Sequence, residues 1–84
     1  MQTAGQTVLI TGGASGIGLA LARKFHAAGN RVIVAGRSED RLTAAAAALP
    51  GLKTCAADIS LAEDRERLAR TFGDVSVLVN NAGI

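Results

Sequence analysis

The sequence predicts an α/β fold in which a parallel sheet of about four strands, in the order 3-2-1-4, has helices on both faces. Short apolar runs alternate with helical patterns along the chain, and a glycine-rich turn joins the first strand to the first helix. Right-handed crossovers place the first two helices on one face of the sheet and the third on the other. The 84 residues, 1–84, allow one small domain at most.

The first predicted strand, Thr7–Thr11, leads into three glycines at the spacing G-x-x-x-G-x-G. Gly12 can turn sharply off the strand, because glycine takes positive φ without steric cost. Gly16 leaves no Cβ in the way of a pyrophosphate, and Gly18 lets the next helix lie close to the strand. Because a helix N-terminus attracts anions, and Ser15 adds a hydroxyl, the stretch predicts a nucleotide site. A glycine-rich turn without a ligand is the alternative.

The first predicted helix turns one apolar face to the sheet and ends at a C-cap formed by Gly29-Asn30. The single histidine, His26, has no partner at metal-ligand spacing and is expected to be an ordinary surface or boundary residue. The apolar positions recur at helical spacing and are Ile17, Ala20, Leu21, Phe25 and Ala28.

The second predicted strand, Arg31–Ala35, is apolar after its first residue, as expected for a parallel strand buried on both faces. Ser38 is a typical N-cap for the second helix, which runs to about Leu49 and stops at Pro50-Gly51. The residues of this helix that we expect to face the sheet are Leu42, Ala45, Ala46 and Leu49.

The third predicted strand, Leu52–Ala57, suits a sheet edge, because polar residues interrupt its apolar run. Cys55 within it is expected to be a buried small hydrophobe. Ser60–Glu63 matches a capping box that starts the third helix, and Val75–Val79 forms the fourth strand. On the third helix, the expected inward residues are Leu61, Leu68 and Phe72, and the expected exposed ion pairs are Glu63–Arg67 and Glu66–Arg70.

Composition excludes several classes of function. The net charge is +2 with no basic run and no aromatic platforms, which argues against nucleic-acid binding. No apolar run reaches the length of about 18 residues that a membrane span needs. The N-terminus lacks the pattern of a signal peptide. We therefore expect a cytoplasmic protein that binds neither nucleic acid nor membrane, with no metal site.

Polar residues or glycines follow all four predicted strands. Besides the glycine-rich turn, these are Arg37, Asp58 and Asn80. The carboxyl ends of parallel strands share one edge of a sheet, and ligands bind there at the point where the strand order reverses. The sequence therefore predicts one ligand site at this edge.

Two stretches match motifs of a known family. Residues 11–18 match the T-G-x-x-x-G-x-G cofactor motif, and residues 80–83 match the N-N-A-G motif, of the short-chain dehydrogenase/reductases. Asp58 stands where that family has an Asp that hydrogen-bonds adenine. The chain resembles the family over its whole length, which corresponds to about the first third of a typical member. The resemblance implies a three-layer, Rossmann-like fold, of which this chain is the N-terminal, cofactor-binding half.

The resemblance also implies roles for individual residues. Asp58 and the Ile59 backbone would contact adenine, and Asn80 the adenosine ribose region. Asn81, Ala82 and Gly83 would mostly brace the central strands. A turn-forming role for Asp58, and a plain Asn-rich turn at Asn80, are the alternatives. The residues that would hold the pyrophosphate are Gly12, Ser15, Gly16, Ile17 and Gly18.

Arg37 favours NADP over NAD as the cofactor. NAD-dependent enzymes usually carry an acid at the end of the second strand, whereas this chain has Gly36 followed by Arg37. A guanidinium can bind a 2′-phosphate in a bidentate way. Ser15, where many NADP-using members carry a basic residue, weakens this preference, and a solvated loop cation is the alternative for Arg37.

The family's catalytic Ser and Tyr-x-x-x-Lys pair have no counterpart in this sequence, which contains no Tyr. We therefore expect an NADP-dependent alcohol or carbonyl oxidoreductase of which these residues are the inactive cofactor-binding part, with no catalytic residue of its own. The alternatives are a non-catalytic nucleotide-binding or oligomerising module and an inactive truncation product. The uncharged fourth strand and the sparsely covered sheet face predict a homo-oligomer.

Overall fold

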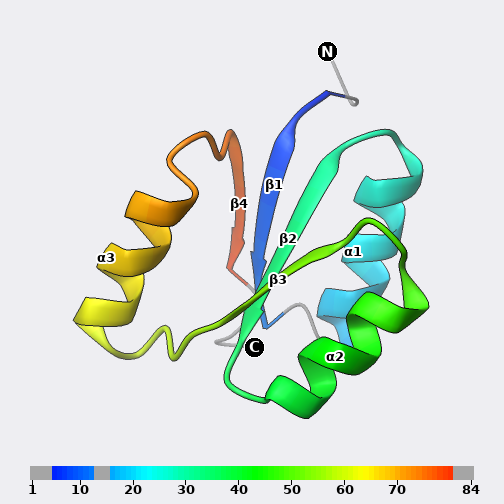
Figure 1. Cartoon of the computed structure of the whole chain (residues 1–84). Coiled ribbons are helices and arrows are strands. Elements are labelled where there is room, and N and C mark those ends of the chain that lie inside the picture. The colour runs from blue at the N-terminus through cyan, green and yellow to red at the C-terminus, as the bar shows by residue number, and fades with distance from the viewer. Residues whose placement is uncertain (1–4, 13–15, 81–84) are drawn as a thin grey trace.

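The computed structural model describes residues 5–12 and 16–80. These residues form a four-stranded parallel sheet in the order β3-β2-β1-β4, which confirms the predicted topology (Figure 1). The elements are β1 (Thr7–Thr11), α1 (Gly16–Ala27), β2 (Arg31–Gly36), α2 (Glu39–Ala48), β3 (Lys53–Ala56), α3 (Ala62–Thr71) and β4 (Val77–Asn80).

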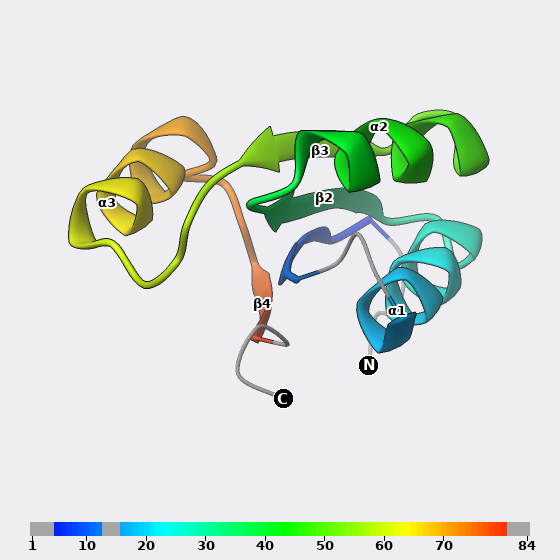
Figure 2. The same ribbon diagram turned by 90° about the horizontal axis from the view of Figure 1, so that it is seen from below.

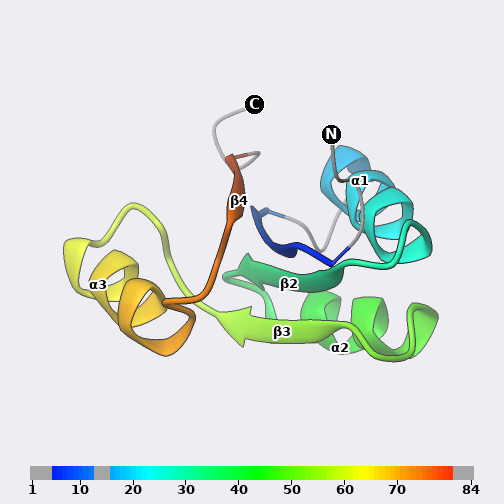
Figure 3. The same ribbon diagram turned by 90° about the horizontal axis from the view of Figure 1, so that it is seen from above.

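The helices cover the two faces of the sheet unequally. Seen from above, α1 and α2 lie on one side of the strands and α3 lies alone on the other, as the right-handed crossovers require (Figure 3). From below, the strand directions turn progressively from β3 to β4, which is the usual twist of a parallel sheet (Figure 2). The sheet is therefore the middle of three layers.

Two apolar clusters fill the spaces between these layers. Along β1, Val8 and Ile10 point to the α1–α2 side and Leu9 points to the α3 side, because successive strand residues alternate in direction. The buried members of the first cluster are Val8, Ile10, Ala22, Val32, Val34, Leu42, Ala45 and Leu52. Those of the second cluster are Leu9, Ile33, Ala35, Ala57 and Leu68.

The expected inward face of α1 was wrong in part. Ile17 is 62% exposed, and Ala20 and Ala28 are also exposed. Gly18 is buried, as expected of a glycine that lets the helix lie close to the strand, and Ala22 is the other buried residue of this helix. Leu21 and Phe25, also expected inward, are partly buried against the first cluster.

Asn30 lies at the amino-terminal edge of the sheet, at the predicted end of α1, and its side chain is hydrogen-bonded on both sides. It is 6% exposed, its Oδ1 accepts from the Gln6 backbone N–H at 3.0 Å, and its Nδ2 donates to the Phe25 carbonyl at 2.9 Å. It thereby joins the last turn of α1 to the start of β1. The sequence pattern identified the helix end but not this buried polar link.

The predicted capping box was wrong. The N-cap of α3 is Leu61, which is 45% exposed and offers no side-chain cap. The Ser60 hydroxyl instead donates to Asp58 Oδ1 at 2.6 Å, because the ionised carboxylate two residues away is a strong acceptor.

Three smaller expectations also changed. Neither expected i, i+4 pair of α3 forms among the described residues, where Asp64 and Arg67 pair at i, i+3 with 3.7 Å between Oδ1 and Nη2. Cys55 is half-buried rather than buried. The fourth strand begins at Val77, two residues later than expected. No helix in residues 5–12 and 16–80 is long and apolar enough to cross a membrane.

Candidate functional site

The candidate site lies at the carboxyl edge of the sheet. β1 pairs with β2 and with β4 in parallel, so that Thr11 lies opposite both Ala35 and Asn80. β2 pairs with β3, with Gly36 opposite Ala56. The residues that follow or end these four strands are Gly12, Arg37, Asp58 and Asn80. The structure therefore brings the backbone positions of all four predicted features to one edge.

The start of the glycine-rich turn has the backbone shape that the sequence predicts. Gly12 has φ +70°, and its N–H donates to the Ala35 carbonyl at 2.8 Å, which fixes the turn to the end of β2. Gly16 has φ +51°, and a Cβ built on it would meet nothing within 4 Å. A side chain would be strained at both glycines, and Gly16 faces open space. Ser15 lies outside the described residues.

The N-terminus of α1 faces this turn and suits an anion. The helix has 12 residues, begins at Gly16, and has no acidic residue in its first turn. Its free N–H groups and dipole favour a negative charge, and no carboxylate opposes it there. The exposed Ile17 stands at the same helix end, where its side chain is available to a ligand.

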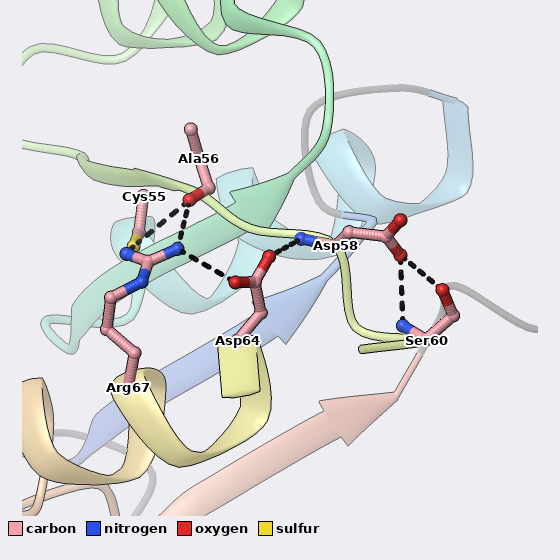
Figure 4. A network of polar contacts seen from close by, with 6 residues as sticks. All are labelled: Cys55, Ala56, Asp58, Ser60, Asp64 and Arg67. Carbon is pink, nitrogen blue, oxygen red and sulfur yellow. Dashed lines mark hydrogen bonds and ion pairs between the residues drawn. The ribbon is translucent and has the colours of Figure 1, made fainter. Parts of the chain in front are cut away.

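Asp58 follows β3 in a tight turn (Figure 4). Its Oδ1 accepts from the Ser60 hydroxyl at 2.6 Å and from the Ser60 backbone N–H at 3.0 Å. The Ser60 hydroxyl and then the Ser60 N–H lower the pKa of Asp58; desolvation opposes them, and the charge of Arg37 has the smallest effect, which also lowers this pKa. The turn-forming alternative for Asp58 is therefore real. Its Oδ2, however, accepts no hydrogen bond from the residues that the structure describes.

Arg37 and Asp58 follow the neighbouring strands β2 and β3. Arg37 is exposed, and its charge acts on the Asp58 carboxylate without an ion pair between them in the described part of the chain. A flexible guanidinium and an ionised carboxylate thus border one side of the edge. A cation to hold a phosphate and an acceptor to hold an amino group are both present.

The remaining predicted site residues are only partly placed. Asn80 ends β4 at the correct edge, and Ile59 is half-buried, with its carbonyl accepting from Arg65 Nη1 at 2.8 Å. Ala82 and Gly83, like Asn81, lie outside the described residues. Across residues 5–12 and 16–80, no group of three or more His, Cys, Asp or Glu residues could hold a metal ion.

An open apolar groove lies on the α3 side of the sheet. Its volume is about 350 Å³, and it extends from Thr11 and Ile59 near the site to Gly73 at the far end of α3. Sequence reasoning did not find it, because the groove arises from how α3 sits over β1 and β4. The other lining residues are Leu9, Arg65, Leu68, Ala69, Phe72, Val75 and Leu78.

Comparisons with known sequences agree with this architecture. The family model for the short chain dehydrogenases matches residues 6–84. The uncharacterized oxidoreductase DltE of Bacillus subtilis is 46% identical over 88 residues, which cover 100% of this chain and 35% of DltE. L-xylulose reductase of Bos taurus is 34% identical over 84 residues, which cover 100% of this chain and 34% of the reductase. This chain spans about a third of the length of these relatives.

Solved structures give the same result. A short chain dehydrogenase/reductase family protein superposes with a TM-score of 0.92 at 44% identity, over 100% of this chain and 36% of that protein. The Pseudomonas aeruginosa RhlG/NADP active-site complex superposes with a TM-score of 0.84 at 34% identity, over 96% of this chain and 36% of RhlG. Because the family model matches residues 6–84 and the fold is that of a solved family member, the chain belongs to the short-chain dehydrogenase family.

Proposed function

We propose that this chain binds NADP at the carboxyl edge of its sheet, as the cofactor-binding part of an NADP-dependent short-chain oxidoreductase. NAD is the less favoured cofactor. The observation that carries the proposal is the open space at Gly16, which has positive φ and begins a helix with no acidic first turn. Arg37 and Asp58 border the same edge.

The described residues fit a dinucleotide. Gly12 and Gly16 would bring backbone close to the pyrophosphate, and the N–H groups at the start of α1 would donate to its oxygens. The ionised Asp58 can only accept, and would accept from the 6-amino group of adenine. Bound NADP would supply a hydride acceptor or donor. The remaining proposed contacts are Ser15, Ile17, Gly18, Ile59, Asn80, Ala82 and Gly83.

Arg37 supports NADP over NAD. It follows β2, where the ribose 2′ position of a bound dinucleotide lies in this type of fold, and it is exposed with no hydrogen-bond or ion-pair partner among the described residues. The solved RhlG complex, similar to this chain, holds NADP. The negative carboxylate of Asp58 nearby would repel the 2′-phosphate. The positive charge of Arg37 would offset this repulsion.

The whole reaction is a proposal that reaches beyond this chain. We propose hydride transfer between NADP and an alcohol or carbonyl compound, as the name of the similar L-xylulose reductase indicates for that enzyme. The sequence contains no Tyr, so we propose that these 84 residues bind the cofactor without catalysing its reaction.

Titration with NADPH and with NADH, followed by the fluorescence of the reduced nicotinamide, tests the proposal. We expect the wild-type chain to bind NADPH more tightly, and R37A to lose about tenfold or more in NADPH affinity with little change for NADH. R70A is the matched control, since Arg70 is an exposed cation in the last turn of α3. No binding of either nucleotide refutes the cofactor site. Equal affinities, unaffected by R37A, refute the preference for NADP.

We also propose that two copies associate through β4. This strand is the last in the sheet order, so its outer edge has no partner strand among the described residues, and Leu78 within it is 63% exposed on the groove side of the sheet. Sedimentation equilibrium measures the association directly. Association that weakens in L78K supports the contact, whereas a monomer at all concentrations, or an association that L78K leaves unchanged, contradicts it.

A further inference from the structure

The turn after β3, which carries Asp58, is hydrogen-bonded to side chains of α3. The backbone of this turn leaves the sheet at Ala56, and the Ala57 N–H donates to the Gly36 carbonyl at 2.9 Å. Beyond Ala57, no strand pairing supports the chain until α3 begins at Ala62. Other groups must therefore fix the direction in which Asp58 points.

Asp64 and Arg67 supply two of these groups (Figure 4). Asp64 Oδ2 accepts from the Asp58 backbone N–H at 2.6 Å. Arg67 Nη2 donates to the Ala56 carbonyl at 2.7 Å and lies 3.7 Å from Asp64 Oδ1, while its Nη1 donates to Cys55 Sγ at 3.5 Å. One carboxylate and one guanidinium thus bind the backbone on both sides of Ala57.

These contacts act on Asp58 from the side opposite to Ser60. The backbone N–H of Asp58 is fixed by Asp64, and its Oδ1 is fixed by Ser60. With both ends held, the side chain has little freedom, and the Oδ2 oxygen remains for a ligand. The Asp64 side chain is 22% exposed, so its short hydrogen bond is partly shielded from water.

We infer that Asp64 and Arg67 are positioning residues that orient the Asp58 carboxylate toward the adenine 6-amino group of the bound dinucleotide. This inference rests on the proposed cofactor binding and adds to it the source of selectivity for adenine. Asp64 and Arg67 touch no part of the ligand. They act through the backbone at Ala56 and Asp58.

A purely structural role makes a different prediction from a positioning role. If the pair only stabilised the fold, its loss would lower the folded fraction and weaken all nucleotides by the same factor. If it orients Asp58, its loss must selectively reduce the preference for a base that donates a hydrogen bond at position 6. The ratio of two affinities, measured on one variant, separates these roles because the folded fraction cancels.

The experiment compares NADPH with its purine analogue, which carries a hydrogen atom in place of the 6-amino group and leaves the ring nitrogen N1 unchanged. We expect wild-type protein to prefer NADPH by about tenfold or more, because the purine analogue lacks the donor from which the charged Asp58 carboxylate would accept. D58A should bring the ratio of dissociation constants close to one. D64A and R67A should each reduce the ratio at least about threefold, in proportion to the lost orientation of Asp58.

E66A is the matched control, since Glu66 is an exposed acid on the same helix with no polar partner among the described residues. It should keep the wild-type ratio. Far-UV circular dichroism confirms that each variant is folded, and R67A provides the test if D64A is not. A wild-type ratio in D64A and R67A overturns the inference and leaves cofactor binding intact. Equal affinity of the wild-type protein for the two nucleotides also overturns the inference. Failure of the wild-type protein to bind NADPH refutes the proposed function itself.

Discussion

Leu42 and Leu68 are buried to the same degree but should differ in what their loss costs. Each leucine is 4% exposed and packs against the sheet. Leu42 belongs to α2 and Leu68 belongs to α3. Leu42 lies in the first cluster, while Leu68 lines the open groove of about 350 Å³. Truncation to Ala therefore leaves a closed void at residue 42 and merely enlarges an open groove at residue 68.

The magnitudes follow from this difference. Either truncation removes three carbons from a buried position, which costs about 2.4 kcal/mol at about 0.8 kcal/mol for each. L42A adds the cost of an unfilled cavity and should reach about 3–4 kcal/mol, whereas water can enter the space in L68A, which should stay near 2–3 kcal/mol. Leu61 is 45% exposed at the start of α3, so L61A should cost below about 1 kcal/mol.

Urea unfolding followed by far-UV circular dichroism measures these differences. A chain of this size is expected to have a total stability of roughly 4–13 kcal/mol. All samples should therefore contain the same concentration of trimethylamine N-oxide, which strengthens burial and preserves a folded baseline for the variants. With a slope of about 1 kcal/mol per molar urea, the midpoints of L42A and L68A should differ by about 1 M. An equal or larger loss in L68A refutes the reasoning that the groove is open to water.

Three further outcomes are expected. G16A and G5A should lose similar stability, about 1–2 kcal/mol, because both glycines have positive φ and open surroundings, but fluorescence titration should show weaker NADPH binding in G16A alone. The hydrogen bonds from Ser60 hold the pKa of Asp58 below its ordinary 3.8, so the stability that Asp58 contributes is present above that pH and is lost as pH falls through the lower folded-state pKa. Urea midpoints between pH 6 and pH 3 should therefore fall less in D58N than in wild type, and equal falls contradict this. The Arg31–Asp74 ion pair, 2.8 Å long with side chains 57% and 56% exposed, should give a coupling below about 1 kcal/mol in a double-mutant cycle, and a larger value contradicts its assignment as a solvated pair.

Much of the fold could be predicted because its strands are short and strongly apolar. Arg31–Gly36 and Thr7–Thr11 stand out from their surroundings, and the alternation of strands with helices leaves few topologies open. The face of α1 was harder, because periodicity counts large apolar residues as buried. Here Gly18 and Ala22 occupy the buried positions and Ile17 is left outside.

The candidate site could be located from sequence, but its internal contacts could not. Glycines and polar residues after the strands were enough to predict one edge. Around Asp58, however, Ser60 and Asp64 could each form several hydrogen bonds that cap the helix or close the turn, and the sequence alone does not distinguish between them. Only the position of α3 against the end of β3 decides that Asp64 binds the turn and that Ser60 does not cap the helix.

The central place of β1 has a consequence for the order in which the chain folds. On one side, contacts such as that between Gln6 and Asn30 span 24 residues and can form as soon as β2 has been synthesised. On the other side, contacts such as that between Thr7 and Ser76 span 69 residues. Such long-range closure is slow, and a growing chain must wait for it until β4 has left the ribosome. We therefore expect β1 to stay half-paired between the emergence of β2 and that of β4, with one of its edges open to wrong pairing during that interval.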